Sequence, residues 1–110
     1  MKILLSVVAF GLSCLVLTLT PPALAATPGA GAQVFSANCA ACHIGGGNVV
    51  NARKTLKEND LKTYGMETLE AVMSQVANGH GAMPAFRSRL TPEQMENVAA
   101  YVLDEAKKGW

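Results

Sequence analysis

The feature of this chain that most constrains its fold is the pentapeptide Cys39-Ala40-Ala41-Cys42-His43. Two residues between the cysteines place both thiols on one helical turn, from which both can add to the vinyl groups of a single haem. The adjacent histidine then lies beneath the iron and supplies an imidazole nitrogen. The motif therefore predicts one covalently bound haem c, held by Cys39 and Cys42, with His43 as an axial ligand.

Three other uses of such a motif fit the rest of the sequence less well. A thioredoxin-like redox pair follows a strand, and no strand pattern precedes Cys39. A structural zinc site normally draws on a second spaced pair of ligands, which the sequence does not supply. A disulfide between Cys39 and Cys42 would close too short a loop to add much stability.

The first 25 residues have the order of a secretory signal peptide. A basic start at Met1-Lys2 precedes an apolar run from Ile3 to about Leu19, and two prolines and the small-residue pattern Ala23-Leu24-Ala25 follow. We expect cleavage after Ala25, with residues 1–25 removed and residues 26–110 forming one domain. The alternative is a retained membrane anchor, but no basic stop-transfer flank follows the run.

Charge in the expected mature chain is balanced. The full sequence has nine basic and eight acidic residues, and cleavage would remove only Lys2, which leaves eight of each. Nucleic-acid binding calls for a basic patch, so this class of partner is not expected. Export places the domain outside the cytoplasm, in a compartment such as the bacterial periplasm, with no stable membrane insertion after cleavage.

The hydrophobic pattern predicts an all-α domain with about four short helices. We expect helices over about 31–40, 54–64 and 66–78, and a final helix that begins after Thr91. Thr91 as N-cap, Pro92 at the first position and Gln94 three residues on form a capping box. Gly65 is expected to cap the second helix, and Val49-Val50 are expected to be buried.

The sixth iron ligand is sought among the remaining methionines and His80. Met73 and Met95 lie on apolar helix stripes and Met66 starts a helix, all of which are positions typical of packing. Met83 differs because it lies in the loop Gly79-His80-Gly81-Ala82-Met83-Pro84, where glycine permits close approach to a flat group and proline favours an extended backbone. His80 shares the loop and is the rival ligand.

Ligation by His43 and Met83 would leave no open position on the iron. The chemistry would then be outer-sphere electron transfer, and the thioether would favour the ferrous state and raise the reduction potential. The chain would be an electron carrier and not an enzyme. A haem peroxidase or gas-binding protein with a displaceable sixth ligand is the alternative from the enzyme class.

These motifs resemble those of the cytochrome c6 family, the electron carriers of the thylakoid lumen in cyanobacteria and algae. The likeness runs from about Gly31 to Trp110. It is carried by Val34-Phe35-Ser36-Ala37-Asn38 with the cysteine motif, Gln75-Val76-Ala77-Asn78-Gly79, Ala82-Met83-Pro84-Ala85-Phe86, Arg89-Leu90 and Val98-Ala99-Ala100-Tyr101-Val102.

The resemblance implies a class I cytochrome c fold with His43 and Met83 as axial ligands. It also implies electron transfer from the cytochrome b6f complex to photosystem I, a haem environment that includes Gln75, and Arg89 near the docking surface. A terminal cytochrome oxidase is an alternative acceptor. His80 departs from the family pattern close to the expected docking surface, a change that concerns the choice of partner rather than the fold.

Overall fold

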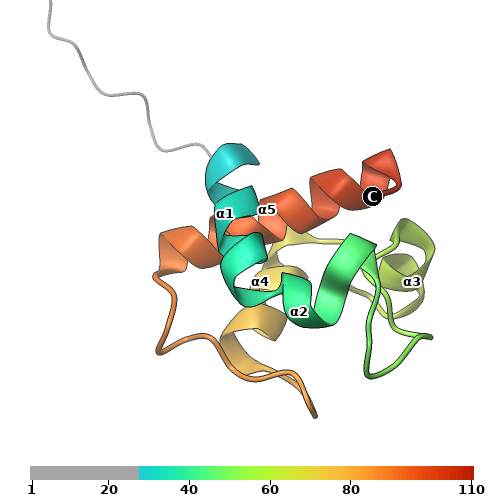
Figure 1. Ribbon diagram of the computed structural model, residues 1–110, viewed down its shortest axis with the longest axis horizontal. Coiled ribbons are helices and arrows are strands. Elements are labelled where there is room, and N and C mark those ends of the chain that lie inside the picture. The colour runs from blue at the N-terminus through green and yellow to red at the C-terminus, as the bar shows by residue number, and fades with distance from the viewer. Residues whose placement is uncertain (1–27) are drawn as a thin grey trace, which may run out of the picture.

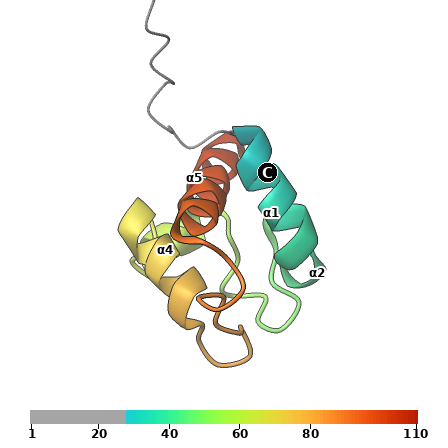
Figure 2. The same cartoon turned by 90° about the vertical axis from the view of Figure 1, so that its left-hand side faces the viewer.

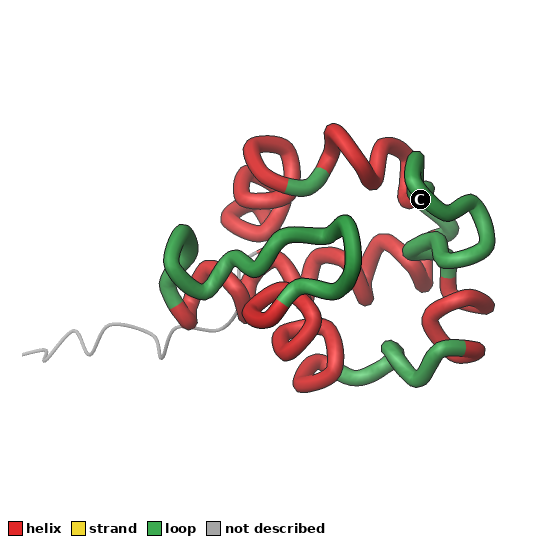
Figure 3. The backbone as a smooth tube through the Cα atoms, turned by 90° about the horizontal axis from the view of Figure 1, so that it is seen from below, coloured by secondary structure: helices red, strands yellow, loops and turns green. Residues whose placement is uncertain are grey.

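The computed structural model describes residues 28–110, and the predicted signal peptide lies outside this range. Helices joined by loops make up these residues, without a strand, as Figure 3 shows. This confirms the all-α prediction. The elements, labelled in part in Figure 1, are α1 (Pro28–Asn38), α2 (Ala40–His43), the 3₁₀ turn η1 (Ile44–Gly46), α3 (Glu58–Thr63), α4 (Leu69–Asn78) and α5 (Pro92–Lys108).

The most extensive helix contact joins α1 to α5, and α4 packs on α5 as well. Figure 2 shows α1 and α4 on opposite sides of α5. Gly31 makes the α1–α5 crossing possible, because a Cβ atom at this position would lie 2.3 Å from the Asn97 carbonyl oxygen and 2.7 Å from Tyr101 Cβ. The absence of a side chain lets the two backbones approach closely.

The core is built mainly from the inward stripe of α5 and the residues that face it. Val98 and Ala99 are 1% and 0% exposed, respectively. The other buried apolar residues are Val34, Phe35, Leu61, Val72, Val76, Phe86, Leu90, Met95, Val102 and Ala106. This core is small for a domain, which is typical of chains that pack around an additional group.

The predicted start of α5 is confirmed in detail. Thr91 Oγ1 accepts from the Gln94 backbone N–H at 3.1 Å, and Gln94 Oε1 accepts from the Thr91 N–H at 2.9 Å. Pro92 occupies the first turn. The capping box therefore satisfies two backbone donors that the helix itself cannot.

Gly65 also ends α3 as predicted. It has φ +67°, and the Gly65 and Met66 N–H groups donate to the carbonyls of Lys62 and Leu61 at 3.2 and 2.7 Å. This pair of bonds is a Schellman motif, in which a left-handed glycine closes the helix.

Several predicted helix boundaries were wrong. The first helix begins at Pro28 rather than about residue 31, because proline is well suited to an opening helical turn. It ends at Asn38, and Cys39 separates it from α2. The second helix spans only Glu58–Thr63 instead of 54–64, and the third begins at Leu69 instead of Met66, because Thr68 caps it by accepting from the Ala71 N–H at 3.2 Å.

Candidate haem site

The cysteine motif lies where α1 passes into α2. The Cys39 N–H donates to the Phe35 carbonyl at 2.8 Å, and the His43 N–H donates to the Cys39 carbonyl at 2.9 Å. The motif therefore continues the helical hydrogen bonding across the break. Cys39 is half-buried and Cys42 exposed, and both are free thiols.

Burial, together with the neighbouring Cys42, raises the pKa of the Cys39 thiol to about 11. Thioredoxin-like pairs depend on a cysteine whose pKa is lowered, so that the thiolate is present at neutral pH. The environment of Cys39 has the opposite effect, which disfavours the thioredoxin-like alternative.

A backbone carbonyl of the following loop fixes the orientation of the His43 ring. Its Nδ1 lies 2.8 Å from the Gly47 carbonyl oxygen. A carbonyl can only accept, so Nδ1 carries the proton in this bond. In the neutral ring, Nε2 then has a free lone pair. This is the usual arrangement of a histidine that binds a metal through Nε2.

Met83 lies in a tight turn between α4 and α5. The His80 N–H donates to the Met83 carbonyl and the Met83 N–H to the His80 carbonyl, both at 3.0 Å. The side chain of Met83 is half-buried, whereas His80 is exposed. Gln75 Nε2 donates to the Met83 sulfur at 3.6 Å, so the structure brings together two residues that the sequence analysis singled out separately.

Gly79 allows this turn to follow α4 directly. Its φ and ψ are 68° and 178°, a combination that is essentially restricted to glycine. A Cβ atom would lie 2.5 Å from the Met83 carbonyl oxygen. Beyond the turn, the Phe86 N–H donates to the Val76 carbonyl at 2.9 Å, which ties the loop back to α4.

Arg89 is exposed at the far end of the same loop. Its guanidinium lies 5.5 Å from the centre of the Phe86 ring, a cation–π geometry. Arg87, also exposed, donates to Asn78 Oδ1 at 2.6 Å. The loop thus exposes two cationic side chains. Arg89 contacts the Phe86 ring, and Arg87 is hydrogen-bonded to the last residue of α4.

Val49 and Val50 correct a prediction, because they are 64% and 67% exposed rather than buried. Their backbone folds against the motif, with the Val49 N–H donating to the Cys42 carbonyl at 3.0 Å, but the polypeptide core does not reach their side chains. Ile44 is also largely exposed. Exposed apolar side chains around a binding motif commonly mark a site for an apolar group.

These observations fit a c-type haem. The motif offers two free thiols and one imidazole with Nε2 available, and the turn after α4 offers a thioether. Thiol, imidazole and thioether are the donor set of covalently attached haem with His/Met ligation. Within residues 28–110, no three His, Cys, Asp or Glu side chains are grouped so as to hold a metal ion by themselves.

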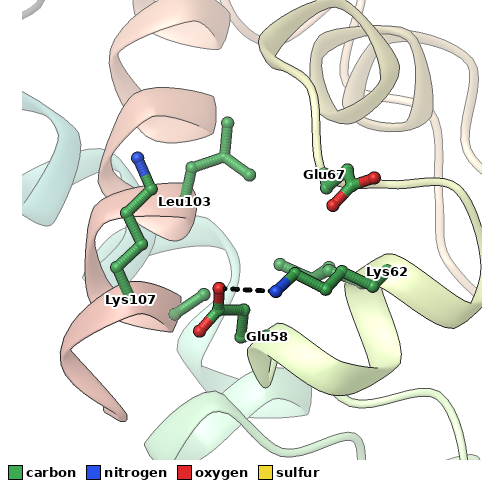
Figure 4. Close-up of a pocket in the computed structure, with 7 residues that line it drawn as sticks. Glu58, Lys62, Glu67, Leu103 and Lys107 are labelled. Carbon is green, nitrogen blue, oxygen red and sulfur yellow. Dashed lines mark ion pairs between the residues drawn. The ribbon is translucent and has the colours of Figure 1, made fainter.

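A pocket away from the cysteine motif is separate from the candidate haem site. It lies between α3 and α5, and Figure 4 shows Glu58, Lys62, Leu103 and Lys107 around it. Lys62 pairs with Glu58 at 3.0 Å across one turn of α3. None of the predicted haem residues lines this pocket.

The three consecutive glycines Gly45, Gly46 and Gly47, here called the glycine loop, contribute to the site in a way that the sequence did not predict. Gly47 acts through its carbonyl, which no residue type signals. Asn48 fixes the turn that follows, since its Oδ1 accepts from the Val50 and Asn51 N–H groups and its Nδ2 donates to the Lys54 carbonyl. An asparagine after a glycine run was the available signal.

Among residues 28–110, no helix is both long and apolar enough to cross a membrane.

Comparison with known proteins gives a consistent result. Residues 26–102 match a family model described as cytochrome C oxidase, cbb3-type, subunit III. A cytochrome c6 from Synechococcus sp. is 57% identical over 110 residues, which are 100% of this chain and 98% of that protein. A cytochrome c6 from Thermosynechococcus vestitus is 58% identical over 109 residues, covering 99% and 96% of the two chains.

A solved structure extends the likeness to three dimensions. Cytochrome c6 from the diatom Phaeodactylum tricornutum superposes with a TM-score of 0.74 at 53% identity. The superposition covers 76% of this chain and 98% of that one.

Proposed function

This chain belongs to the cytochrome c6 family, and from that premise we propose that it carries single electrons from the cytochrome b6f complex to photosystem I. Members of the family are electron carriers with one covalently bound haem c, not enzymes. The proposed compartment is the thylakoid lumen or the equivalent bacterial periplasm.

Four side chains are proposed to hold the haem. Cys39 and Cys42 form the thioether links, His43 binds the iron through Nε2, and Met83 binds it through sulfur. The haem supplies a reversible one-electron change between ferric and ferrous iron. His43 and Met83 together leave no open position for oxygen or substrate, which favours electron transfer over a peroxidase or gas-binding role.

One observation carries the assignment of Met83 over His80. Within their shared turn, Gln75 donates to the sulfur of half-buried Met83, whereas the imidazole of His80 is exposed. A ligand needs a fixed orientation toward the iron, and such a hydrogen bond supplies one.

A terminal oxidase is the second candidate acceptor, and the description of the matching family model favours including it. The test is flash-induced oxidation of the reduced holoprotein by isolated photosystem I, compared with steady-state oxidation by isolated cytochrome oxidase. We expect the second-order rate constant for photosystem I to exceed that for the oxidase. Transfer to photosystem I should slow as salt rises, because the exposed cations Arg87 and Arg89 lie on the loop that follows the proposed ligand turn. Faster transfer to the oxidase would overturn the photosynthetic route while leaving the carrier role intact.

We also propose that the chain is exported and cleaved after Ala25. The match to the family model begins at Ala26, which supports this boundary. The intact mass of the holoprotein isolated from the exporting cell should correspond to residues 26–110 plus one haem. A mass that includes residues 1–25 would contradict the proposal and favour the retained anchor.

Replacing Gln75 with leucine should lower the reduction potential. An N–H directed at the sulfur withdraws electron density from the ligand and so disfavours ferric iron. A net hydrogen bond of ~0.5–1.5 kcal/mol corresponds to roughly 20–60 mV for one electron. Potentiometric titration of the holoprotein measures the shift.

Gln33→Leu provides the control, because Gln33 is exposed on α1. A fall in potential in both variants, or in neither, would show that the Gln75 amide does not act on the ligand.

A further inference from the structure

The C-terminal residue folds back onto the glycine loop beside the cysteine motif. Gly109 and Trp110 have φ values of 88° and 62°, and the Trp110 N–H donates to the Glu105 carbonyl at 2.9 Å. A left-handed backbone is unfavourable for a bulky residue and persists only where contacts hold it. The contacts of the Trp110 side chain therefore hold its backbone in this conformation.

The indole joins both ends of the loop 46–56. Its Nε1–H donates to the Leu56 carbonyl at 2.8 Å, and the Leu56 N–H donates to the Gly46 carbonyl at 2.8 Å. The ring lies directly on Gly46, where a Cβ atom would come within 2.5 Å of three ring carbons. A single side chain thus closes the loop and requires glycine at its base.

The ring rests on a rigid base formed by α1 and α5. Its centre lies 5.3 Å from the Phe35 ring and 6.1 Å from the Tyr101 ring, the latter edge to face. Phe35 and Tyr101 are themselves 5.3 Å apart. Aromatic clusters of this geometry hold their members in fixed orientations.

The loop leads from this clamp to His43. Gly47 follows Gly46, donates to the Ile44 carbonyl at 3.0 Å and accepts from His43 Nδ1 at 2.8 Å. We propose that Trp110 is a positioning residue for the His43 imidazole, acting through Gly46 and the Gly47 carbonyl. The inference rests on the proposed role of His43 as an axial ligand.

The physical reason is the freedom of three consecutive glycines. Gly45, Gly46 and Gly47 carry no side chains that could restrict their backbone, and Gly45 and Gly46 have φ values of 61° and 76°. Without the indole on Gly46, the Gly47 carbonyl is free to turn away from His43. The imidazole would then lose the partner that fixes its tautomer and ring orientation.

The test is hydrogen exchange of the His43 Nδ1 proton, followed by NMR in the ferrous holoprotein. We compare the wild type with Trp110→Ala and with Leu103→Ala as the matched control. Leu103 lies on α5, the helix that ends just before Trp110, but it lines the pocket beside α3, to which no residue of the 43–47 segment contributes. In the ferrous wild type, the His43 ring protons are first checked for the large ring-current shifts of a haem axial ligand, so that failure of the His43 assignment is recognised separately.

We expect exchange about tenfold faster in Trp110→Ala than in Leu103→Ala, after both rates are normalised to global unfolding. Trp110→Phe, which keeps an aromatic ring on Gly46, should restore most of the protection. Equal normalised rates in Trp110→Ala and Leu103→Ala would overturn the proposal. Should Trp110→Ala fail to fold, Trp110→Leu takes its place, and the same comparison with Leu103→Ala decides.

Discussion

Replacing Met83 with leucine should abolish the weak far-red charge-transfer band of the oxidised holoprotein. Leucine keeps the apolar volume but removes the sulfur, so the sixth position opens to water or an added ligand. The reduction potential should fall by on the order of 0.1–0.3 V, within the roughly 0.8 V range that axial ligation spans. Absorption spectroscopy and potentiometric titration measure both effects, and carbon monoxide should bind the ferrous variant rapidly.

Met95→Leu is the matched control for this experiment. Met95 is 8% exposed on α5 and belongs to the core, so the same substitution there removes no ligand. Its band and potential should stay close to those of the wild type. If Met83→Leu kept its spectrum and His80→Gln changed it, the ligand would be His80 and the proposed assignment would be wrong.

Replacing Gly79 with alanine should destabilise the fold and displace the ligand turn together. The φ and ψ of Gly79 are costly for alanine by ~1–3 kcal/mol, and the added Cβ would meet the Met83 carbonyl at 2.5 Å. We expect the free energy of unfolding to fall by roughly 2–4 kcal/mol, with a weaker methionine band because Met83 is pushed from its place. Denaturant unfolding of the holoprotein and its oxidised spectrum report the two effects.

Gly81→Ala separates backbone strain from the clash. Gly81 lies in the same turn with φ +55°, but a Cβ atom there meets nothing within 4 Å. Its substitution should cost about 1 kcal/mol, the usual penalty of a left-handed residue, with the band intact. Equal effects of Gly79→Ala and Gly81→Ala would show that the contact with Met83 is unimportant.

The parts of the fold that local interactions determine could be predicted from the sequence. The capping box of α5 involves only Thr91 and Gln94, and the closure of α3 involves Gly65 and its immediate neighbours. The capping residues themselves form the contacts, so the residue types were sufficient evidence. The cysteine motif was equally informative because its spacing is set by the group it binds.

Other parts depend on residues far apart in the chain. Trp110 donates to Leu56 across 54 positions, and no local pattern signals that contact. The exposure of Val49 and Val50 was mispredicted because apolar character alone does not distinguish contact with the polypeptide core from exposure beside a ligand site. The Gly47 carbonyl was missed because a backbone acceptor leaves no trace in residue type.

The crossing of α1 and α5 has a consequence for the order of events during biogenesis. Gly31 meets Asn97 and Tyr101 only after nearly the whole domain has been synthesised, and closing so long a loop has an entropic cost. A chain that still lacks α5 therefore lacks the surface on which α1 packs, so the helix that leads into the cysteine motif gains its tertiary support only when the last helix is complete.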